Sequence, residues 1–253
     1  MNTDVLIIGS GVAGSIAAIT LADAGYDVVV VTRTPNAEES NTYYAQGGIV
    51  AEGENDSWEK LNEDILIAGA GMTNPRAAEI LSKEGPKLVK QLLIERSKVE
   101  FDKHGDKLSL TKEGGHGISR IIHSADATGK AIALAVTKQL KEHQRIKLLT
   151  GYTAIDLLTP AHQSLDPLAV YEPLACVGAY LLNQETRDVT KCLAKQTILA
   201  TGGLGQIYEF TTNPAGARGD GIAMAHRAGA RVANQLQCNL LTALFFDVLL
   251  VVW

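Results

Sequence analysis

The chain has 253 residues, of which 46% are hydrophobic and 20% charged, and its formal net charge at pH 7 is −5. This length allows one large domain or two smaller ones, and the negative charge argues against a general electrostatic attraction to nucleic acid. The cysteines Cys176, Cys192 and Cys238 are far apart, and no CxxC or His/Cys cluster occurs. We therefore expect reduced thiols, no disulfide framework and no metal site.

The first 33 residues predict a strand, a glycine turn, a helix and a second strand. Residues 4–8 are a short apolar run typical of a buried parallel strand, residues 15–24 have apolar side chains at helical spacing, and residues 27–32 are rich in valine. The motif G-x-G-x-x-G joins the first strand to the helix, which is the context in which it binds a dinucleotide. Its residues are Gly9, Ser10, Gly11, Val12, Ala13 and Gly14.

Each glycine of this motif has its own physical role. Gly9 permits a tight turn, Gly11 leaves room for a pyrophosphate near the backbone, and Gly14 lets the helix pack against the strand. The motif alone does not identify the dinucleotide. The acid that usually binds the ribose is missing, because the second strand ends at Thr32 and Arg33. Arg33 leaves two interpretations open, a contact to the 2′-phosphate of NADP or a solvated side chain at a strand end.

A polar, turn-rich stretch follows at residues 34–55. Within it, residues 40–48 read SNTYYAQGG and combine hydroxyls, amides, aromatic rings and a glycine pair. Such a loop can surround a flat polar ring system, or it can be an ordinary surface loop. Helices are predicted at residues 58–70 and 75–93, the second with Asn74 as its N-cap.

A hairpin is predicted at residues 101–110, and the loop TKEGGHG follows at residues 111–117. Glu113 and His116 flank the glycines of this loop and could reach into a site. A solvated loop without a chemical role is the simpler alternative. A further helix is predicted at residues 130–142.

The second half of the chain predicts mainly strands. Asp126 or Thr128 can cap the helix that follows them. Strands are predicted at residues 146–150, 152–158, 176–182 and 189–200, with a loop at 160–173 and a last helix at 222–230. The strand that ends at Ala200 runs into Thr201, Gly202 and Gly203, and ligands bind at such strand ends in open α/β sheets. Asp220 can cap the last helix or bind a hydroxylated ligand chain. The order of elements predicts an α/β fold.

A set of motifs in a fixed order resembles the flavoprotein superfamily of succinate dehydrogenase and fumarate reductase. The motifs lie between about residues 3 and 234 and are GSGVAG, SNTYYAQGGI, LTKEGGHG, HSADATG, ILATGG, TTNP and GDGIAMAHRAGA. Within the superfamily they are most similar to the L-aspartate oxidase branch. The resemblance implies a Rossmann-like FAD-binding domain of the GR2 type at residues 1–234, with a parallel central sheet and an additional β-meander. In succinate dehydrogenases a histidine carries FAD covalently, and Asn41 stands at that position here, which implies non-covalent FAD.

The resemblance also implies roles for individual residues. Arg33, Thr153 and Ala154 are expected near the adenosine, and Asp220 close to the flavin. Glu113 matches the carboxylate that orients the amino group of L-aspartate. The residues expected to bind FAD are Gly9, Ser10, Gly11, Val12, Ala13, Gly14, Arg33, Asn41, Thr42, Tyr43, Tyr44, Ala45, Gln46, Gly47, Gly48, Thr153, Ala154, Thr201, Gly202, Gly203 and Asp220.

The implied reaction is the oxidation of L-aspartate to iminoaspartate, a step of NAD biosynthesis through quinolinate. FAD would take a hydride from Cα of L-aspartate, and O₂ or fumarate would then reoxidise the flavin. Quinolinate synthase would be the downstream partner. Because the N-terminus enters the first strand without a signal peptide, we expect a cytoplasmic location.

The last part of the chain departs from the family pattern. After Asn234 the family continues with E-F-x-Q-F-H-P-T-A-L, whereas this chain reads QLQCNLLTALFFDVLLVVW. We therefore expect residues 235–253 to be an atypical apolar tail, with the capping domain and the catalytic arginine missing and little or no activity. The apolar run is short for a membrane span, and Asp247 interrupts it. Two alternatives stay open, a non-catalytic FAD-binding or interaction module and another fumarate reductase-like flavoprotein.

Overall fold

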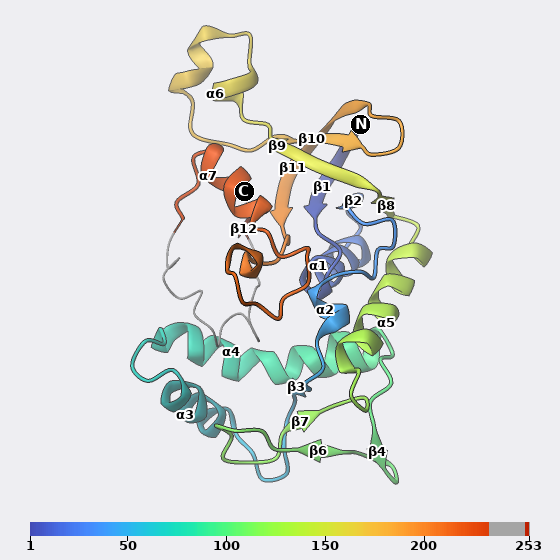
Figure 1. Cartoon of the computed structure of the whole chain (residues 1–253), viewed down its shortest axis with the longest axis vertical. Helices are drawn as coiled ribbons and strands as arrows, with labels where there is room; N and C mark the ends of the chain where they lie inside the picture. The colour runs from blue at the N-terminus through green and yellow to red at the C-terminus, as the bar shows by residue number, and fades with distance from the viewer. Residues whose placement is uncertain (233–250, 253) are drawn as a thin grey trace. The chain divides into compact units, whose positions relative to one another are not determined.

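The computed structural model describes residues 1–232 and 251–252. The chain divides into two compact units, the first comprising Met1–Thr42 and Val136–Trp253 and the second comprising Tyr43–Ala135. Figure 1 labels the elements of both units. Cys238 and the predicted apolar tail at residues 235–253 lie outside the described residues, apart from the short strand β12 (Val251–Val252). The predicted domain boundary after residue 234 also falls there.

A mixed sheet forms the centre of the first unit (Figure 1). Its strand order is β8-β2-β1-β11-β10-β9, and β12 pairs with β11. The β8-β2-β1-β11 part is parallel, whereas β11, β10 and β9 form an antiparallel meander. This confirms the predicted parallel sheet with an additional β-meander. The strands are β1 (Asn2–Ile8), β2 (Val28–Thr32), β8 (Ile146–Thr150), β9 (Tyr152–Leu157), β10 (Gly178–Asn183) and β11 (Val189–Leu199).

The parallel strands end together at one edge of this sheet. Ile8 of β1 lies opposite Val31 of β2 and Leu199 of β11. β2 is buried along its whole length, as expected of a valine-rich parallel strand covered on both faces. The turns that follow Ile8 and Leu199 therefore emerge side by side at the carboxyl edge, which is where ligands bind in open α/β sheets.

The helices of the first unit begin earlier than their apolar patterns predict. α1 (Val12–Asp23) starts within the glycine motif, and α7 (Asp220–Arg227) starts at the aspartate itself. Small residues in these first turns give no helical periodicity, so the sequence pattern misses them. Gly25, with φ +95°, follows α1 in the left-handed conformation typical of a residue just after a helix.

The prediction of a plain loop at residues 160–173 is wrong. The segment contains the short helix α6 (Pro160–Gln163) and the 3₁₀-helix η2 (Pro167–Tyr171). A proline stands at the first position of each, where its missing N–H is not needed. Asp166 caps η2 because its side chain accepts a hydrogen bond from the Leu168 N–H at 2.9 Å. A third short helix of this unit is η3 (Gly205–Ile207).

The second unit combines helices with short strands. The predicted helix at residues 75–93 starts as expected, since Asn74 accepts hydrogen bonds from Arg76 and Ala77 N–H. It is α-helical only to Leu88, with Pro86 inside it, and continues as a π-helix. The elements are α3 (Trp58–Ala68), α4 (Pro75–Leu88), η1 (Val89–Arg96), β3 (Ile49–Val50), β4 (Lys103–His104), β5 (Lys107–Leu108), β6 (Leu110–Thr111) and β7 (Ile121–Ile122).

Three further features bear on function. β4 and β5 form the predicted hairpin, and β3, β7 and β6 form a small sheet. α2 (Asn41–Tyr44) and α5 (Thr128–Glu142) each include residues of both units. The loop predicted at residues 40–48 is therefore partly helical.

Cys176 and Cys192 are buried free thiols, as predicted, and burial raises the pKa of Cys192. Within residues 1–232 and 251–252, no helix is long and apolar enough to cross a membrane. The same residues contain no group of three or more metal-ligating side chains that could hold an ion.

Candidate functional site

The turn after β1 is a candidate ligand site within the first unit. Gly9 has φ +115°, and a Cβ at this position would lie 2.1 Å from the Ala200 carbonyl oxygen. A Cβ at Gly14 would lie 2.0 Å from the Gly9 carbonyl oxygen. Neither position has room for a side chain, which confirms the tight turn and the close helix packing that the motif predicts.

The N-terminus of α1 is suited to an anion. Its first turn contains no acidic residue, and its N-cap Gly11 offers no side-chain hydrogen bond. A Cβ at Gly11 would be in ordinary van der Waals contact with Thr42 Oγ1 at 3.5 Å and Ser40 Cβ at 3.7 Å, so these two side chains line this side of the turn. The Val12 N–H donates to the same Thr42 oxygen at 3.0 Å. Backbone N–H groups and the helix dipole at such an end favour a phosphate group.

A buried hydroxyl at the neighbouring strand end lacks a partner. Thr201 Oγ1 follows β11 and makes no hydrogen bond. This hydroxyl lies against Gly221, and a Cβ at Gly221 would come within 1.9 Å of Thr201 Oγ1. The hydroxyl therefore fits only because residue 221 has no side chain. Buried polar atoms are nearly always hydrogen-bonded, so a bound ligand would supply the missing partner. The glycine turn, the helix N-terminus and this hydroxyl together fit the pyrophosphate and the hydroxylated chain of FAD.

Residues expected at the adenosine end of FAD are linked by Gln184. Its side-chain amide donates to the Arg33 carbonyl oxygen at 2.8 Å and to Thr153 Oγ1 at 3.0 Å. Ala154 follows Thr153 on β9 and pairs with Leu181 of β10. Gln184 carries no sequence signal, because it lies in the turn between β10 and β11 and belongs to no motif.

Arg33 and Asp220 form an ion pair, with Nη1 and Oδ2 3.0 Å apart. Arg218 reaches the same oxygen at 2.8 Å. The sequence predicts Arg33 at the adenosine and Asp220 near the flavin, whereas the structure brings them into contact. Both side chains are partly exposed, and such a pair contributes only about 0–1 kcal/mol. A ligand can therefore replace either partner at little cost.

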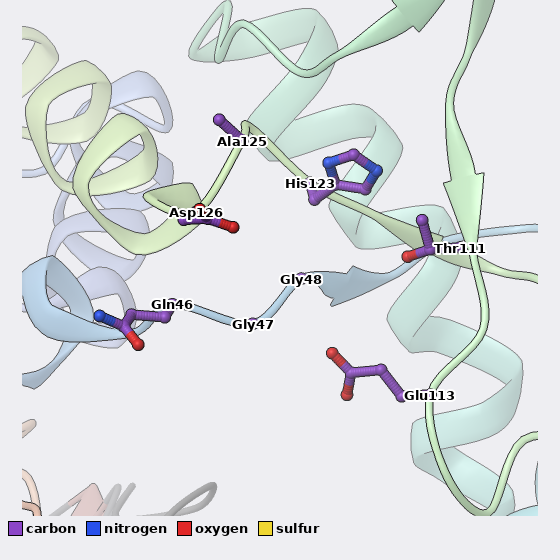
Figure 2. Close-up of a pocket in the computed structure, with 8 residues that line it drawn as sticks. All are labelled: Gln46, Gly47, Gly48, Thr111, Glu113, His123, Ala125 and Asp126. Carbon is purple, nitrogen blue, oxygen red and sulfur yellow. The ribbon is translucent and has the colours of Figure 1, made fainter.

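A cavity of about 320 Å³ is a separate candidate site within the second unit. Figure 2 shows its lining, with the Glu113 carboxylate directed toward Gly47 and Gly48 and the Asp126 side chain entering the same space. The predicted residues Gln46, Gly47, Gly48 and Glu113 line it. Its other lining residues, which the sequence did not single out as a site, are Thr111, His123, Ala125 and Asp126.

The earlier residues of the predicted flavin loop do not line this cavity. Asn41 and Thr42 begin α2, and Tyr43 and Tyr44 follow them. The two tyrosine rings meet edge to face with centroids 5.3 Å apart, and the Lys130 amine lies 5.7 Å from the Tyr43 ring. Gly48 is required by packing as well, since a Cβ there would lie 2.0 Å from Ile121 Cγ2.

His123 is held in a fixed orientation in the wall of the cavity. Its Nδ1 lies 3.0 Å from Asp102 Oδ2, and the same oxygen accepts the Ala125 N–H at 2.8 Å. Ala125 has φ +44°, an uncommon conformation for alanine that this hydrogen bond stabilises. His123 Nε2 is buried without a partner. The sequence could not reveal the pairing, because Asp102 lies in the predicted hairpin.

The charges of the cavity lining favour a cationic group. Glu113 and Asp126 contribute carboxylates, and the eight lining residues include neither lysine nor arginine. An ammonium group suits this lining better than a carboxylate does.

The family described as FAD binding domain matches residues 4–244. L-aspartate oxidase 1 of Ralstonia nicotianae is 42% identical over 236 residues, which are 92% of this chain and 43% of that protein. The L-aspartate oxidase of Vibrio cholerae is 42% identical over 91% of this chain and 43% of its own length. L-aspartate oxidase 2-a, chloroplastic, of Nicotiana tabacum is 38% identical over 91% of this chain and 34% of its own length. The chain thus spans less than half the length of these relatives.

Solved structures show the same fold. The apo form of the Mycobacterium smegmatis Sdh1 complex has a TM-score of 0.79 at 29% identity, over 90% of this chain and 39% of that chain. E. coli quinol fumarate reductase FrdA has a TM-score of 0.78 at 22% identity, over 89% of this chain and 37% of that chain. The second likeness concerns the fold alone.

Proposed function

We propose that this chain, which belongs to the FAD binding domain family, is the FAD-binding part of an L-aspartate oxidase. FAD is the cofactor of this family, and in our proposal its pyrophosphate lies on the glycine turn at residues 9–14. The fit of that turn to an anion and the unpartnered Thr201 hydroxyl support this placement. The binding is proposed to be non-covalent, since the Asn41 amide has no nucleophilic nitrogen with which to form a bond to the flavin.

The Glu113 carboxylate is the observation that carries the substrate assignment. It lines a cavity with one further carboxylate and neither lysine nor arginine, and it follows the L-T-x-E-G-G-H pattern of the L-aspartate oxidase branch. In the proposal, Glu113 binds the amino group of L-aspartate and fixes the direction of its Cα–H bond. Bound FAD would accept the hydride from Cα, the amino group would lose a proton to a base, and the product would be iminoaspartate.

The wider context is part of the same proposal. Oxidation of L-aspartate is proposed for a protein of the relatives' full length, since this chain spans 43% of the Ralstonia and Vibrio relatives. O₂ or fumarate would be the electron acceptor, and quinolinate synthase would consume the product in NAD biosynthesis. We keep residues 1–234 as the FAD-binding domain, residues 235–253 as a distinct tail, and the cytoplasm as the location. The tobacco relative, in contrast, is named as chloroplastic.

A titration of the FAD-loaded chain tests the substrate assignment. Succinate has the two carboxylates of L-aspartate but no amino group, so it is the matched control ligand. We expect L-aspartate to perturb the flavin absorption spectrum at a concentration roughly tenfold lower than succinate, the effect of one charge-assisted hydrogen bond. The substitution E113Q should remove this difference.

The other outcomes identify the alternatives. Tighter binding of succinate than of L-aspartate would contradict the proposal and favour a fumarate reductase-like flavoprotein. FAD binding without a response to either dicarboxylate would favour a non-catalytic FAD-binding module.

A further inference from the structure

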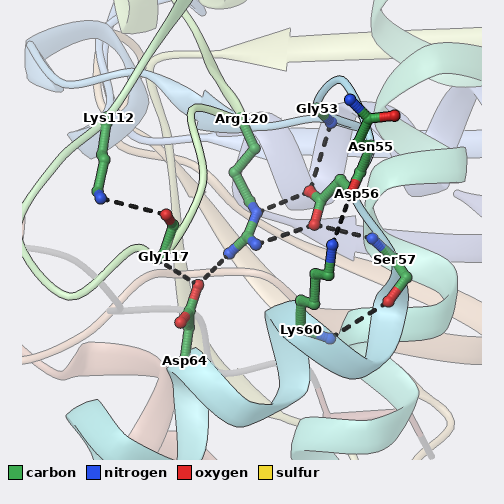
Figure 3. Close-up of polar contacts among 9 residues, drawn as sticks. All are labelled: Gly53, Asn55, Asp56, Ser57, Lys60, Asp64, Lys112, Gly117 and Arg120. Atoms are coloured by element: carbon green, nitrogen blue, oxygen red, sulfur yellow. Dashed lines mark hydrogen bonds and ion pairs between the residues drawn. The ribbon is translucent and has the colours of Figure 1, made fainter.

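Arg120 is the largest fully buried side chain in the described part of the chain. Its guanidinium donates to both carboxylate oxygens of Asp56, from Nε at 2.8 Å and from Nη2 at 2.9 Å. It also donates from Nη1 to Asp64 Oδ2 at 2.5 Å. Figure 3 shows these bonds converging on one guanidinium. We call Arg120, Asp56 and Asp64 the arginine cluster; all three belong to the second unit.

Asp64 also holds the loop at residues 112–119, which carries Glu113. Its Oδ2 accepts the Gly117 N–H at 2.8 Å, in addition to the bond from Arg120 (Figure 3). The ends of the loop are joined separately, since the Arg120 N–H donates to the Thr111 carbonyl oxygen at 3.1 Å. Asp64 lies on α3, so one carboxylate connects this mostly exposed loop to a helix.

Asp56 shares Arg120 with Asp64 but bonds to a different segment. Its oxygens accept the Gly53 N–H at 3.4 Å and the Ser57 N–H at 2.9 Å, both close to it in sequence. None of the hydrogen bonds described for Asp56 reaches the loop at residues 112–119. The two aspartates carry the same charge, their side chains are 5% and 15% exposed, and of the two only Asp64 has a direct hydrogen bond to the loop.

The protonation states support an ionic cluster. Burial opposes ionisation of Asp64, but the Gly117 N–H and the Arg120 guanidinium outweigh it and lower the pKa. The pKa of Asp56 is also lowered, because Arg120 and two backbone N–H groups outweigh its burial. Both carboxylates are therefore charged at neutral pH, and the bonds to Arg120 are charge-assisted on both sides.

We propose that Asp64, held in place by Arg120, is a positioning residue for Glu113. Through Gly117 it fixes the loop on α3 and so determines where the Glu113 carboxylate stands in the cavity. The identity of the ligand that Glu113 contacts rests on the proposed function, whereas the fixing of the loop does not. Asp64 and Asp56 provide a matched pair, because only Asp64 bonds to the loop.

Hydrogen–deuterium exchange on the FAD-loaded chain tests the fixing of the loop. Leucine has nearly the shape of aspartate but accepts no hydrogen bond, so the variants are D64L and D56L. We expect D64L to raise amide exchange at residues 113–119 by about tenfold or more. D56L should leave it within about twofold of the unchanged chain. Equal acceleration in both variants, or none in D64L, would overturn the proposal.

Asparagine variants keep this test decisive if the leucine variants do not fold. D64N and D56N each retain a side-chain oxygen but lose the charge, and they are compared directly with each other. We expect about a threefold acceleration at residues 113–119 in D64N and less in D56N. An acceleration in D56N as large as in D64N would overturn the proposal.

A ligand titration of the same variants tests the consequence for Glu113. D64L should weaken L-aspartate binding about tenfold, close to the effect of E113Q, and leave FAD and succinate binding unchanged. A loosened loop with undiminished L-aspartate binding would overturn the positioning role. If the unchanged chain does not distinguish L-aspartate from succinate, the proposed function fails, while the exchange experiment still decides whether Asp64 fixes the loop.

Discussion

The glycine turn of the first unit and the cavity of the second unit are built in different ways. The turn is contiguous, and it is shaped by the absence of side chains at Gly9 and Gly14. The cavity is assembled from three separate stretches, at residues 46–48, 111–113 and 123–126. A contiguous site can be recognised from residue types at fixed spacing. An assembled site depends on long-range contacts that spacing does not reveal.

One ion pair from each unit shows a further difference. The ion pair of Arg145 and Asp27 in the first unit is at least half exposed, whereas Arg120 in the second unit is fully buried. Exposed pairs contribute little to stability, whereas a buried charge that loses its partner is costly. Loss of charge should therefore be costly to stability at Arg120 in the second unit. Added bulk should be costly at the glycine turn in the first unit.

Loss of the buried arginine should have the largest effect. R120M leaves two buried carboxylates without their partner and should lower the free energy of unfolding by about 3–5 kcal/mol. The exposed control R145M should change it by less than about 1 kcal/mol. Urea unfolding followed by Trp58 fluorescence, in a W253F background, measures the second unit. Similar midpoints for R120M and R145M would refute the difference.

Added bulk at the glycine turn should have the next largest effect. G14A places a Cβ 2.0 Å from the Gly9 carbonyl oxygen, which should cost about 2–3 kcal/mol of stability and abolish FAD binding. G25A is the control, because its Cβ would meet no atom within 4 Å. Its positive φ should cost only about 1 kcal/mol, with FAD binding retained. Fluorescence titration with FAD measures the difference, and normal FAD affinity in G14A would contradict it.

The arginine cluster should make the second unit sensitive to acid. Because the folded pKa values of Asp56 and Asp64 are lowered, their contribution is complete above the unfolded pKa of about 4 and is lost as pH falls through the folded values. We expect a loss of about 1–2 kcal/mol in this acidic range. Urea midpoints between neutral and acidic pH measure it. The urea midpoint should depend less on pH in R120M than in the unchanged chain. An equally strong pH dependence in R120M would exclude the cluster as its cause.

Removal of the Gln184 bridge should have the smallest effect. Q184A breaks two neutral hydrogen bonds near the proposed adenosine end, so FAD affinity should fall by about fivefold. Q163A is a control in the same unit, since the side-chain bonds of Gln163 within the described residues go to nearby Thr159. It should bind FAD as the unchanged chain does. Equal weakening by the two substitutions would argue against an adenosine contact at Gln184.

Much of the fold could be predicted because its signals are local. The valine run of β2, the glycines around α1, and Asn74 before α4 each act through neighbours in sequence. The π-helix after Leu88 was missed, because the apolar pattern continues past Pro86 while the hydrogen bonding changes.

The candidate site was predicted less completely, for a physical reason. His123 depends on Asp102, and Arg120 depends on partners 56 and 64 residues away in the chain. In the sequence, Arg120 is only a polar residue before an apolar pair. Nothing in its neighbours indicates burial, so the cluster could be recognised only from the structure.

The absorption spectrum of the purified chain, incubated with FAD and freed of excess, tests the central claim most directly. We predict the visible bands of a bound flavin, and acid precipitation should release that flavin into the supernatant because Asn41 cannot bind it covalently. A folded chain that remains colourless would contradict FAD binding. Flavin that stays with the precipitated protein would contradict the non-covalent assignment.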